Sequence, residues 1–311
     1  MKKLFCLFLA VMLLGLCGCN AALKGITVPT ETDNPGSDPK EDNVMNILMI
    51  GGSFCYYYVE ELYGIAKAAG IDMRVCNVYR SGCNTEQHYN FWRQGEPVYQ
   101  FFVTDENGRN KTDGCNLEYC FQQGNWDVIS FQDACGFRTA DDLQIIDAFI
   151  ANSKIYRDAL IGHARELFPK AEIYWHQPWS FEIGYESGNS KMDSIEKQEV
   201  ADRYIEELSL RVCQEQNLKR IPTGEAWKLV RHHPLINGTL CYRLNKNNGL
   251  GDFYHDGDIG GGQYLNACVW FETLTGQSCI GNTWRPDYDL SEEKIAVLQQ
   301  AAHQAVQNLN S

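Results

Sequence analysis

Short apolar segments alternate with longer helical patterns over most of this chain of 311 residues. The short segments are rich in β-branched and aromatic residues and have the length of strands, whereas the longer ones carry apolar residues at helical spacing. Strands that alternate with helices form a parallel sheet with helices on both faces. We therefore predict an α/β fold of three layers around a parallel sheet of about five strands. The expected strands are residues 46–50, 73–79, 126–132, 171–177 and 218–222.

The remaining patterns describe one domain with an insertion. The composition is ordinary for a globular protein, with 44% hydrophobic and 22% charged residues, and we expect a single domain over residues 44–311. Residues 91–125 interrupt the alternation, and "VTDENGRN" predicts a β-hairpin around Asn107-Gly108, inserted between strands. Helices are expected at residues 57–69, 142–168, 194–216, 225–232, 263–274 and 291–309, the last with Ser291 as its N-cap.

The first 43 residues are expected to lie outside this domain. Lys2 and Lys3 precede the apolar run "LFCLFLAVMLLGL", the pattern of an export signal that is too short for a membrane-spanning helix. The run ends in "LCGC", which resembles a bacterial lipobox with Cys19 as the lipidated residue. A cleaved signal of a soluble protein is the alternative, but no A-x-A site is present. We expect a signal peptide at residues 1–18, a lipid anchor on Cys19 and a polar tether over residues 19–43.

This anchor predicts a protein attached to a bacterial membrane and facing the periplasm or the cell surface. A net charge of −13 and a pI near 5.0 argue against a nucleic-acid partner, which requires clustered Lys and Arg. No C-x-x-C pair indicates zinc or redox chemistry, and the acidic loop "HDGDIGGG" has too few ligands for calcium. We therefore expect no metal and no cofactor. Several cysteines are expected to be buried, with Cys115–Cys120 or Cys76–Cys83 as alternative local disulfides.

The candidate chemistry begins at "IGGSF", where Ser53 directly follows the first expected strand. Ligands of an open parallel sheet bind beyond the carboxyl ends of its strands. Gly51 and Gly52 permit a tight turn, and N–H groups at the following helix start can stabilise an oxyanion. The later glycine of a dinucleotide site and the lysine of a P-loop are both missing. Ser53 is therefore either a nucleophile or a turn residue.

A nucleophilic serine needs a base, and the base needs an orienting carboxylate. Of the seven histidines, His255 is the best candidate because Asp252 lies three residues before it, in the loop "GLGDFYHDGDIGGG". Asp252 can accept the imidazole Nδ1–H while Nε2 faces Ser53. An Asp and a His at this spacing are also common by chance. His176, at the end of an expected strand, is expected to line the pocket without acting as the base.

Together these segments resemble the SGNH/GDSL hydrolase superfamily. Its first block corresponds to "IGGSF", its last block DxxH to "DFYH", and its second block to "YRSGCN" with Gly82. The third block, normally GxND, is "SFQD" here, with Ser130 for Gly and Gln132 for Asn, and the first block lacks the Asp of GDS. The order carries the resemblance across roughly residues 47–276. Segments such as "ILMIGGSF" and "GGQYLNACVWFETLTG" are similar to a Bacteroidetes branch of lipoproteins and secreted proteins, catalogued as a domain of unknown function.

The resemblance implies a flavodoxin-like SGNH fold and ester hydrolysis, with Ser53, His255 and Asp252 as the catalytic residues. The α/β-hydrolase alternative fits neither the strand order nor the short Asp–His spacing. The oxyanion hole would consist of the N–H groups of Ser53 and Gly82 and the side chain of Gln132. Tyr56, Trp92 and Trp179, near strand ends or in the insertion, are the expected substrate-binding residues beside His176.

The expected substrate is a small-molecule or glycan ester, and a carbohydrate esterase that removes O-acyl groups from glycans is the leading hypothesis. A lipid or small-ester hydrolase is one alternative. A glycan-binding lipoprotein without catalytic activity is another, because two of the four sequence blocks are altered.

Overall fold

The computed structural model describes four stretches of the chain, residues 44–133, 145–187, 190–236 and 261–309. The chain divides into two units, Met1–Asp42 and Asn43–Ser311, and every described element belongs to the second unit. Cys19, Asp252 and His255 lie outside the described residues, so their predicted roles stay predictions. Within these four stretches, no helix is both long and apolar enough to cross a membrane.

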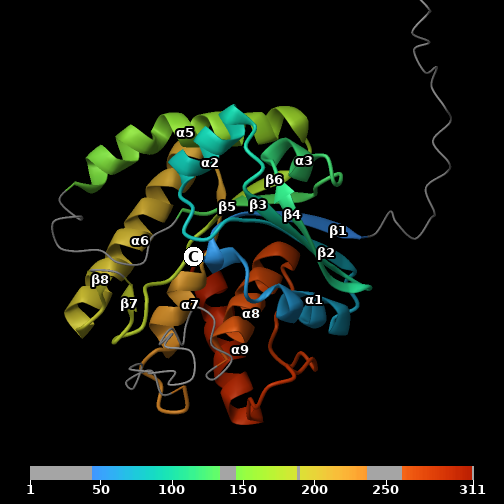
Figure 1. Ribbon diagram of the computed structural model, residues 1–311. Helices are drawn as coiled ribbons and strands as arrows, with labels where there is room; N and C mark the ends of the chain where they lie inside the picture. Colours follow the sequence, from blue (N-terminus) through green and yellow to red (C-terminus); the bar gives the residue numbers. More distant parts are fainter. Residues whose placement is uncertain (1–43, 134–144, 188–189, 237–260, 310–311) are drawn as a thin grey trace, which may run out of the picture. The chain divides into compact units, whose positions relative to one another are not determined.

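A seven-stranded sheet forms the centre of the second unit (Figure 1). All five expected strands are present, and they run parallel to one another in the spatial order second, first, third, fourth, fifth. This is the strand order of flavodoxin-like doubly wound sheets, and the predicted fold class is confirmed. These strands are β1 (Met45–Gly51), β2 (Met73–Tyr79), β5 (Val128–Phe131), β6 (Glu172–His176) and β9 (Lys219–Ile221).

The two additional strands come from the inserted hairpin, which extends the sheet at the β2 edge. β3 (Tyr99–Asp105) pairs antiparallel with both β2 and β4 (Gly108–Cys115). The hairpin turns where it was predicted: Asp105 Oδ1 accepts the Asn107 N–H at 2.8 Å, and Gly108 has a φ of +88°. The prediction of about five strands is correct for the parallel strands. It misses the edge strands because a hairpin's sequence does not say where the hairpin packs.

Helices cover both faces of the sheet, as predicted (Figure 1). Successive residues of β1 alternate between the two cores, with Ile47 and Met49 in one and Leu48 and Ile50 in the other. One face carries α1 (Val59–Ala68), α7 (Thr223–Val230), α8 (Gly262–Thr275) and α9 (Glu292–Gln307). The other carries α2 (Thr85–Gln94), α3 (Leu117–Phe121), α5 (Ile146–Leu167) and α6 (Ile195–Gln216). A small hairpin, β7 (Glu186–Ser187) with β8 (Ser190–Lys191), lies outside the main sheet.

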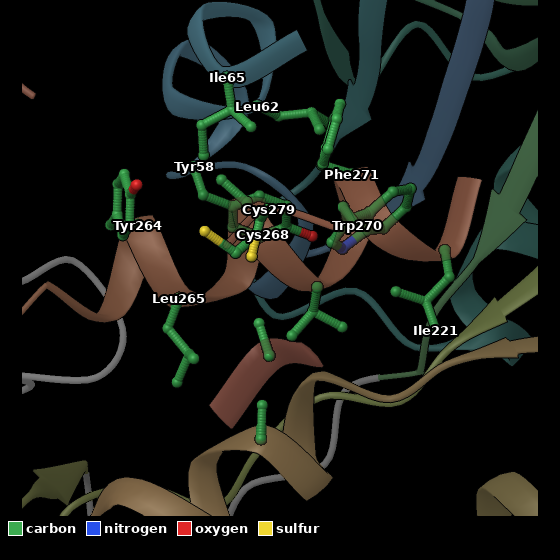
Figure 2. Close-up of a cluster of buried hydrophobic side chains, with 14 of the residues drawn as sticks. Tyr58, Leu62, Ile65, Ile221, Tyr264, Leu265, Cys268, Trp270, Phe271 and Cys279 are labelled. Atoms are coloured by element: carbon green, nitrogen blue, oxygen red, sulfur yellow. The ribbon is translucent and has the colours of Figure 1, made fainter. Parts of the chain in front are cut away.

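Helix α8 is buried almost entirely, between the sheet and helices α1 and α9. Its residues Tyr264, Leu265, Trp270 and Phe271 are all fully buried, and Figure 2 shows Phe271 on the side of α8 that faces Leu62 of α1, with Leu265 pointing away from α1. A helix that is apolar on all sides belongs in a core. The eight cysteines in the described ranges are free thiols, and seven of them are buried, in agreement with the prediction of small buried hydrophobic residues.

Helix α2 was not predicted from the sequence. Its signal is a capping box: the Asn84 side chain accepts the Gln87 N–H at 2.8 Å, and the Gln87 side chain accepts the Asn84 N–H at 3.0 Å. Gly95 ends the helix in the left-handed conformation, with a φ of +66°. His88 lies within this helix and is buried.

Candidate active site

Ser53 begins a 3-10 turn, η2 (Ser53–Cys55), directly after β1. Residues 52–56, called the Ser53 turn below, are closed by two backbone hydrogen bonds. The Cys55 N–H donates to the Gly52 carbonyl at 3.2 Å, and the Tyr56 N–H donates to the Ser53 carbonyl at 3.1 Å. Ser53 is half-buried, and its Oγ has no hydrogen-bond partner among the described residues.

Two buried amide side chains fix the Ser53 turn from neighbouring strands. Gln132, directly after β5, accepts the Gly52 N–H with its Oε1 at 3.2 Å. Asn77, within β2, donates from its Nδ2 to the Cys55 carbonyl at 2.5 Å. Buried backbone groups without a partner are costly, so these two bonds specify one path for the turn. The signal for Asn77 is a polar residue inside the apolar strand "VCNVY".

A third side chain reaches the turn from the inserted hairpin. Arg109 on β4 donates from its Nη2 to the Tyr56 carbonyl at 3.0 Å. Its guanidinium lies 4.2 Å from the Tyr56 ring centroid, and Tyr79 stacks on the same ring at 4.5 Å. The Tyr56 ring is thus packed against side chains of the protein, and its predicted contact with substrate stays a prediction. No pattern in the sequence around Arg109 predicts its contact with the Ser53 turn.

The second strand end contributes the turn at residues 80–83, called the Gly82 turn below. Gly82 is exposed and has a φ of +63°. The Arg80 N–H donates to the Gly51 carbonyl at 3.3 Å, so the start of the Gly82 turn is bonded to the last residue of β1, directly before the Ser53 turn. A Cβ added at Gly52 would lie 3.5 Å from the Gly82 nitrogen. The Gly82 nitrogen therefore lies beside the Ser53 turn, and its predicted role in the oxyanion hole stays a prediction.

Gln132 and the residue after it connect the Ser53 turn to the start of α2. Gln132 is 2% exposed, and its Nε2 donates to the Asp133 carbonyl. Asp133 Oδ1 accepts the N–H of Thr85 at 3.2 Å, at the start of α2. One of the two N–H groups of the Gln132 amide therefore binds Asp133. The predicted role of Gln132 as an oxyanion donor depends on the second N–H group.

Ser53, Gly82 and Gln132 thus meet at one edge of the sheet, at the carboxyl ends of β1, β2 and β5. The chain leaves β1 toward β2 on one side and returns to β5 on the other, so this is the topological switch point where ligands of such sheets bind. Any direct contact of Asp252 and His255 with these residues lies outside the described part of the chain.

His176 and Trp179 lie in the core beneath the Ser53 turn. His176 has no exposed surface; its Nε2 lies 2.9 Å from Thr223 Oγ1, and burial lowers its pKa to about 3, so the ring is neutral. Trp179 is 1% exposed and packs edge-on against Phe54 at 4.8 Å. Trp179 thus packs against the Ser53 turn, and His176 packs near the rings of Trp179 and Trp270. Both side chains are buried, so their predicted contact with substrate has no exposed surface to use.

Trp92 lies away from the strand ends. It occupies the last turn of α2, donates from its Nε1 to Glu118 Oε1 at 2.6 Å and stacks on His163 of α5 at 4.6 Å. These contacts join α2 to α3 and α5 on one face of the sheet. The packing of Trp92 does not support its predicted role in substrate binding, which stays a prediction.

Two other features of the described residues lie apart from this edge. A hollow of about 350 Å³ lies at the opposite end of the sheet, before β6 and after α6. Its lining residues are Arg165, Phe168, Pro169, Ala171, Ile173 and Asn217. No group of three or more His, Cys, Asp or Glu side chains in the described stretches is arranged to hold a metal ion.

Comparisons with known proteins match both the fold and the expected branch. The family described as "Domain of unknown function (DUF4886)" matches residues 46–305. A crystal structure of a DUF4886 family protein from Bacteroides uniformis is 24% identical, covers 86% of this chain and 96% of its own, and superposes with a TM-score of 0.69. The family match confirms the predicted membership of a branch catalogued as a domain of unknown function. No curated protein matches the chain.

Two further structures are more distant. A putative GDSL-like lipase from Parabacteroides merdae is 15% identical, with a TM-score of 0.41 over 74% of this chain and 94% of its own. A catalytic mutant of an acetylxylan esterase from Geobacillus stearothermophilus is 13% identical, with a TM-score of 0.41 over 78% of this chain and 97% of its own. At such scores the likeness carries no argument about chemistry, which must come from the residues themselves.

Proposed function

This chain belongs to the DUF4886 family, and we propose that it hydrolyses carboxylic esters with Ser53 as the nucleophile. The convergence of Ser53, Gly82 and Gln132 at the switch point of the sheet carries this proposal. A serine that served only as a turn residue would not require two further strand ends with hydrogen-bond donors beside it.

The proposed reaction follows the serine-hydrolase scheme. Ser53 Oγ attacks the ester carbonyl while His255 Nε2 takes the hydroxyl proton, and Asp252 holds the imidazole in the required tautomer. The tetrahedral intermediate then collapses, His255 returns the proton to the leaving alcohol, and the acyl group stays on Ser53. Water, deprotonated by His255, releases the acid and restores the enzyme. The Ser53 and Gly82 N–H groups and the second Gln132 N–H stabilise the oxyanion.

The other histidines support this choice of base. None of the six described histidines is hydrogen-bonded to Ser53, and they are His88, His163, His176, His232, His233 and His303. Ser278, His303 and Glu272 form another group of a serine, a histidine and a carboxylate. In this group the Ser278 hydroxyl and the Glu272 carboxylate both contact Nδ1 of His303, whereas a catalytic triad uses one ring nitrogen for each. His255 is the histidine that remains.

For the substrate, we propose an O-acylated glycan. The support is the resemblance of the N-terminus to a bacterial lipoprotein signal, which would place an esterase on a membrane surface among carbohydrate polymers. Anchoring through Cys19 predicts that Cys19→Ala releases the protein from membranes, and retention of the variant would contradict it. A glycan-binding protein without activity is the second candidate, favoured by the engagement of one Gln132 N–H with Asp133.

A fluorophosphonate probe, which forms a covalent bond with activated serines, tests the nucleophile. We expect wild type to be labelled, and Ser53→Ala and His255→Ala to lose labelling and at least about 10⁴-fold of ester turnover. Ser81→Ala is the matched control, because Ser81 is an exposed serine in the Gly82 turn. A folded wild type that resists labelling would favour the binding protein. Release of acetate from acetylated glycans, compared with long-chain lipid esters, then separates the two substrate classes.

A further inference from the structure

Arg109 contacts the residue that closes the Ser53 turn in two ways. Its Nη2 donates to the Tyr56 carbonyl at 3.0 Å, and its guanidinium lies over the Tyr56 ring at 4.2 Å. It also pairs with Glu60 Oε2 at 3.3 Å, but Glu60 is mostly exposed, and such pairs contribute little. The carbonyl bond and the ring contact therefore determine how Arg109 holds the turn.

The sheet fixes the position of Arg109 itself. Arg109 pairs with Thr104 in the register of β3 and β4, and its guanidinium also lies 4.9 Å from the Phe102 ring. Its side chain is only 17% exposed. A planar guanidinium packed against two neighbouring aromatic rings has few other conformations, so the inserted hairpin presents a fixed donor to Tyr56.

Tyr56 passes this constraint to Ser53 through one hydrogen bond. The Tyr56 N–H donates to the Ser53 carbonyl at 3.1 Å, while the Tyr56 carbonyl accepts from Arg109. A shift of Tyr56 would therefore turn the Ser53 peptide group. A misplacement of reacting groups by about 1 Å can cost about 10²-fold in rate.

We propose that Arg109 is a positioning residue for Ser53, so that the inserted hairpin is part of the catalytic unit and not only an edge of the sheet. This role rests on the proposed ester hydrolysis. Asn77 and Gln132 also hold the turn, but both are buried, Asn77 within β2 and Gln132 directly after β5, where substitution affects folding directly. Arg109 lies on the edge hairpin, which allows its effect on the turn to be measured in a folded protein.

The test compares Arg109→Ala and Arg109→Lys with Lys111→Ala. Lys111 is exposed, lies two residues further along β4 on the same side of the sheet, and its removal changes the charge by the same amount. We expect Arg109→Ala to lower kcat on a small aryl ester, and the rate constant of fluorophosphonate labelling, by about 10- to 100-fold. KM should change by less than about 2-fold. Arg109→Lys should be intermediate because an ammonium lacks the planar stacking surface, and Lys111→Ala should match wild type.

Hydrogen–deuterium exchange separates positioning from activity. The Cys55 and Tyr56 amides, which close the turn, should exchange faster in Arg109→Ala than in wild type or Lys111→Ala. Unchanged labelling in Arg109→Ala would overturn the proposal, as would an equal loss in Lys111→Ala. If wild type is neither labelled nor active, the ester hydrolase proposal fails, and the exchange rates still decide whether Arg109 holds the turn. Unchanged exchange would then reject that role.

Discussion

Two strand–turn–helix units meet at the candidate site, and they are held in different ways. The first runs from β1 through the Ser53 turn to α1, and side chains from β2, β4 and the end of β5 bind its backbone. The second runs from β2 through the Gly82 turn to α2, and it is held mainly by backbone bonds and the α2 capping box, with one distant contact from Asp133 to the Thr85 N–H. The Ser53 turn therefore depends on distant residues, whereas the Gly82 turn depends on its own conformation.

The glycines of the two units show the same difference. A Cβ at Gly51 would lie 2.7 Å from Gln132 Oε1, so this position needs room for a close approach. A Cβ at Gly82 would meet no atom within 4 Å, but its φ of +63° is a conformation that favours glycine. The first glycine is required by tertiary packing and the second by local backbone geometry.

Each unit also ends in a helix with one buried titratable side chain. Burial raises the pKa of Glu61 on α1 to about 7 and lowers the pKa of His88 on α2 to about 3. The two shifts have opposite effects on the pH dependence of stability. Glu61 lowers stability as pH rises, because the unfolded chain releases its proton before the folded protein does. His88 lowers stability as pH falls, because the unfolded chain binds a proton there before the folded protein does.

Glu61→Gln should have the largest effect on stability. Because the folded-state pKa of Glu61 exceeds its usual value near 4.5, the folded protein binds more protons between about pH 4.5 and 7, and wild-type stability falls as pH rises through that range. Removing this titration should make the variant gain about 2.5 kcal/mol relative to wild type between pH 5 and pH 8. Urea unfolding at the two pH values measures the gain.

Glu60→Gln is the matched control for this experiment. Glu60 is the adjacent residue on α1 and has the same side chain, but it is exposed. We expect its stability difference from wild type to stay nearly constant between the two pH values. A similar gain in both variants would show that overall charge, and not burial of Glu61, sets the pH dependence.

His88→Gln tests the second unit at the acidic end. His88 Nδ1 lies 3.0 Å from the Tyr99 hydroxyl, and its Nε2 has no hydrogen-bond partner in the described stretches. The folded-state pKa lies below the unfolded value near 6.5, so wild-type stability falls as pH drops from about 6.5 toward 3. The variant should gain about 2 kcal/mol relative to wild type between pH 7 and pH 5. Exposed His232→Gln should show no such gain, and an equal gain there would reject the explanation.

Asparagine substitutions give the smallest but most direct comparison of the two turns. Gly82→Ala should cost about 1 kcal/mol, and Gly82→Asn should cost less because asparagine tolerates the left-handed conformation. The order should reverse at Gly51, where asparagine is larger than alanine and must displace Gln132. Denaturation midpoints of the four variants measure this. If alanine and asparagine ranked in the same order of stability at both positions, the same constraint would act on both glycines.

Most elements of the fold follow from local patterns in the sequence. The five parallel strands and six of the described helices lie within a few residues of their expected positions, because apolar periodicity reports the face that each element buries. Helix α2 was missed although its capping box "NTEQ" and Gly95 are visible in the sequence. At the site, the placement of Ser53, Gly82 and Gln132 at strand ends followed from strand boundaries alone.

Contacts between segments that are distant in the chain could not be predicted from these local patterns. The sequence alone determined the parallel α/β class and which residues fall at the carboxyl ends of its strands, because strand pattern and strand direction are local properties. Only the tertiary structure decided that the hairpin extends the sheet, that Arg109 reaches Tyr56, and that His176 and Trp179 lie in the core beneath the turn. These contacts join residues far apart in the chain, and their geometry depends on how side chains pack across strands, which no periodicity in the sequence records.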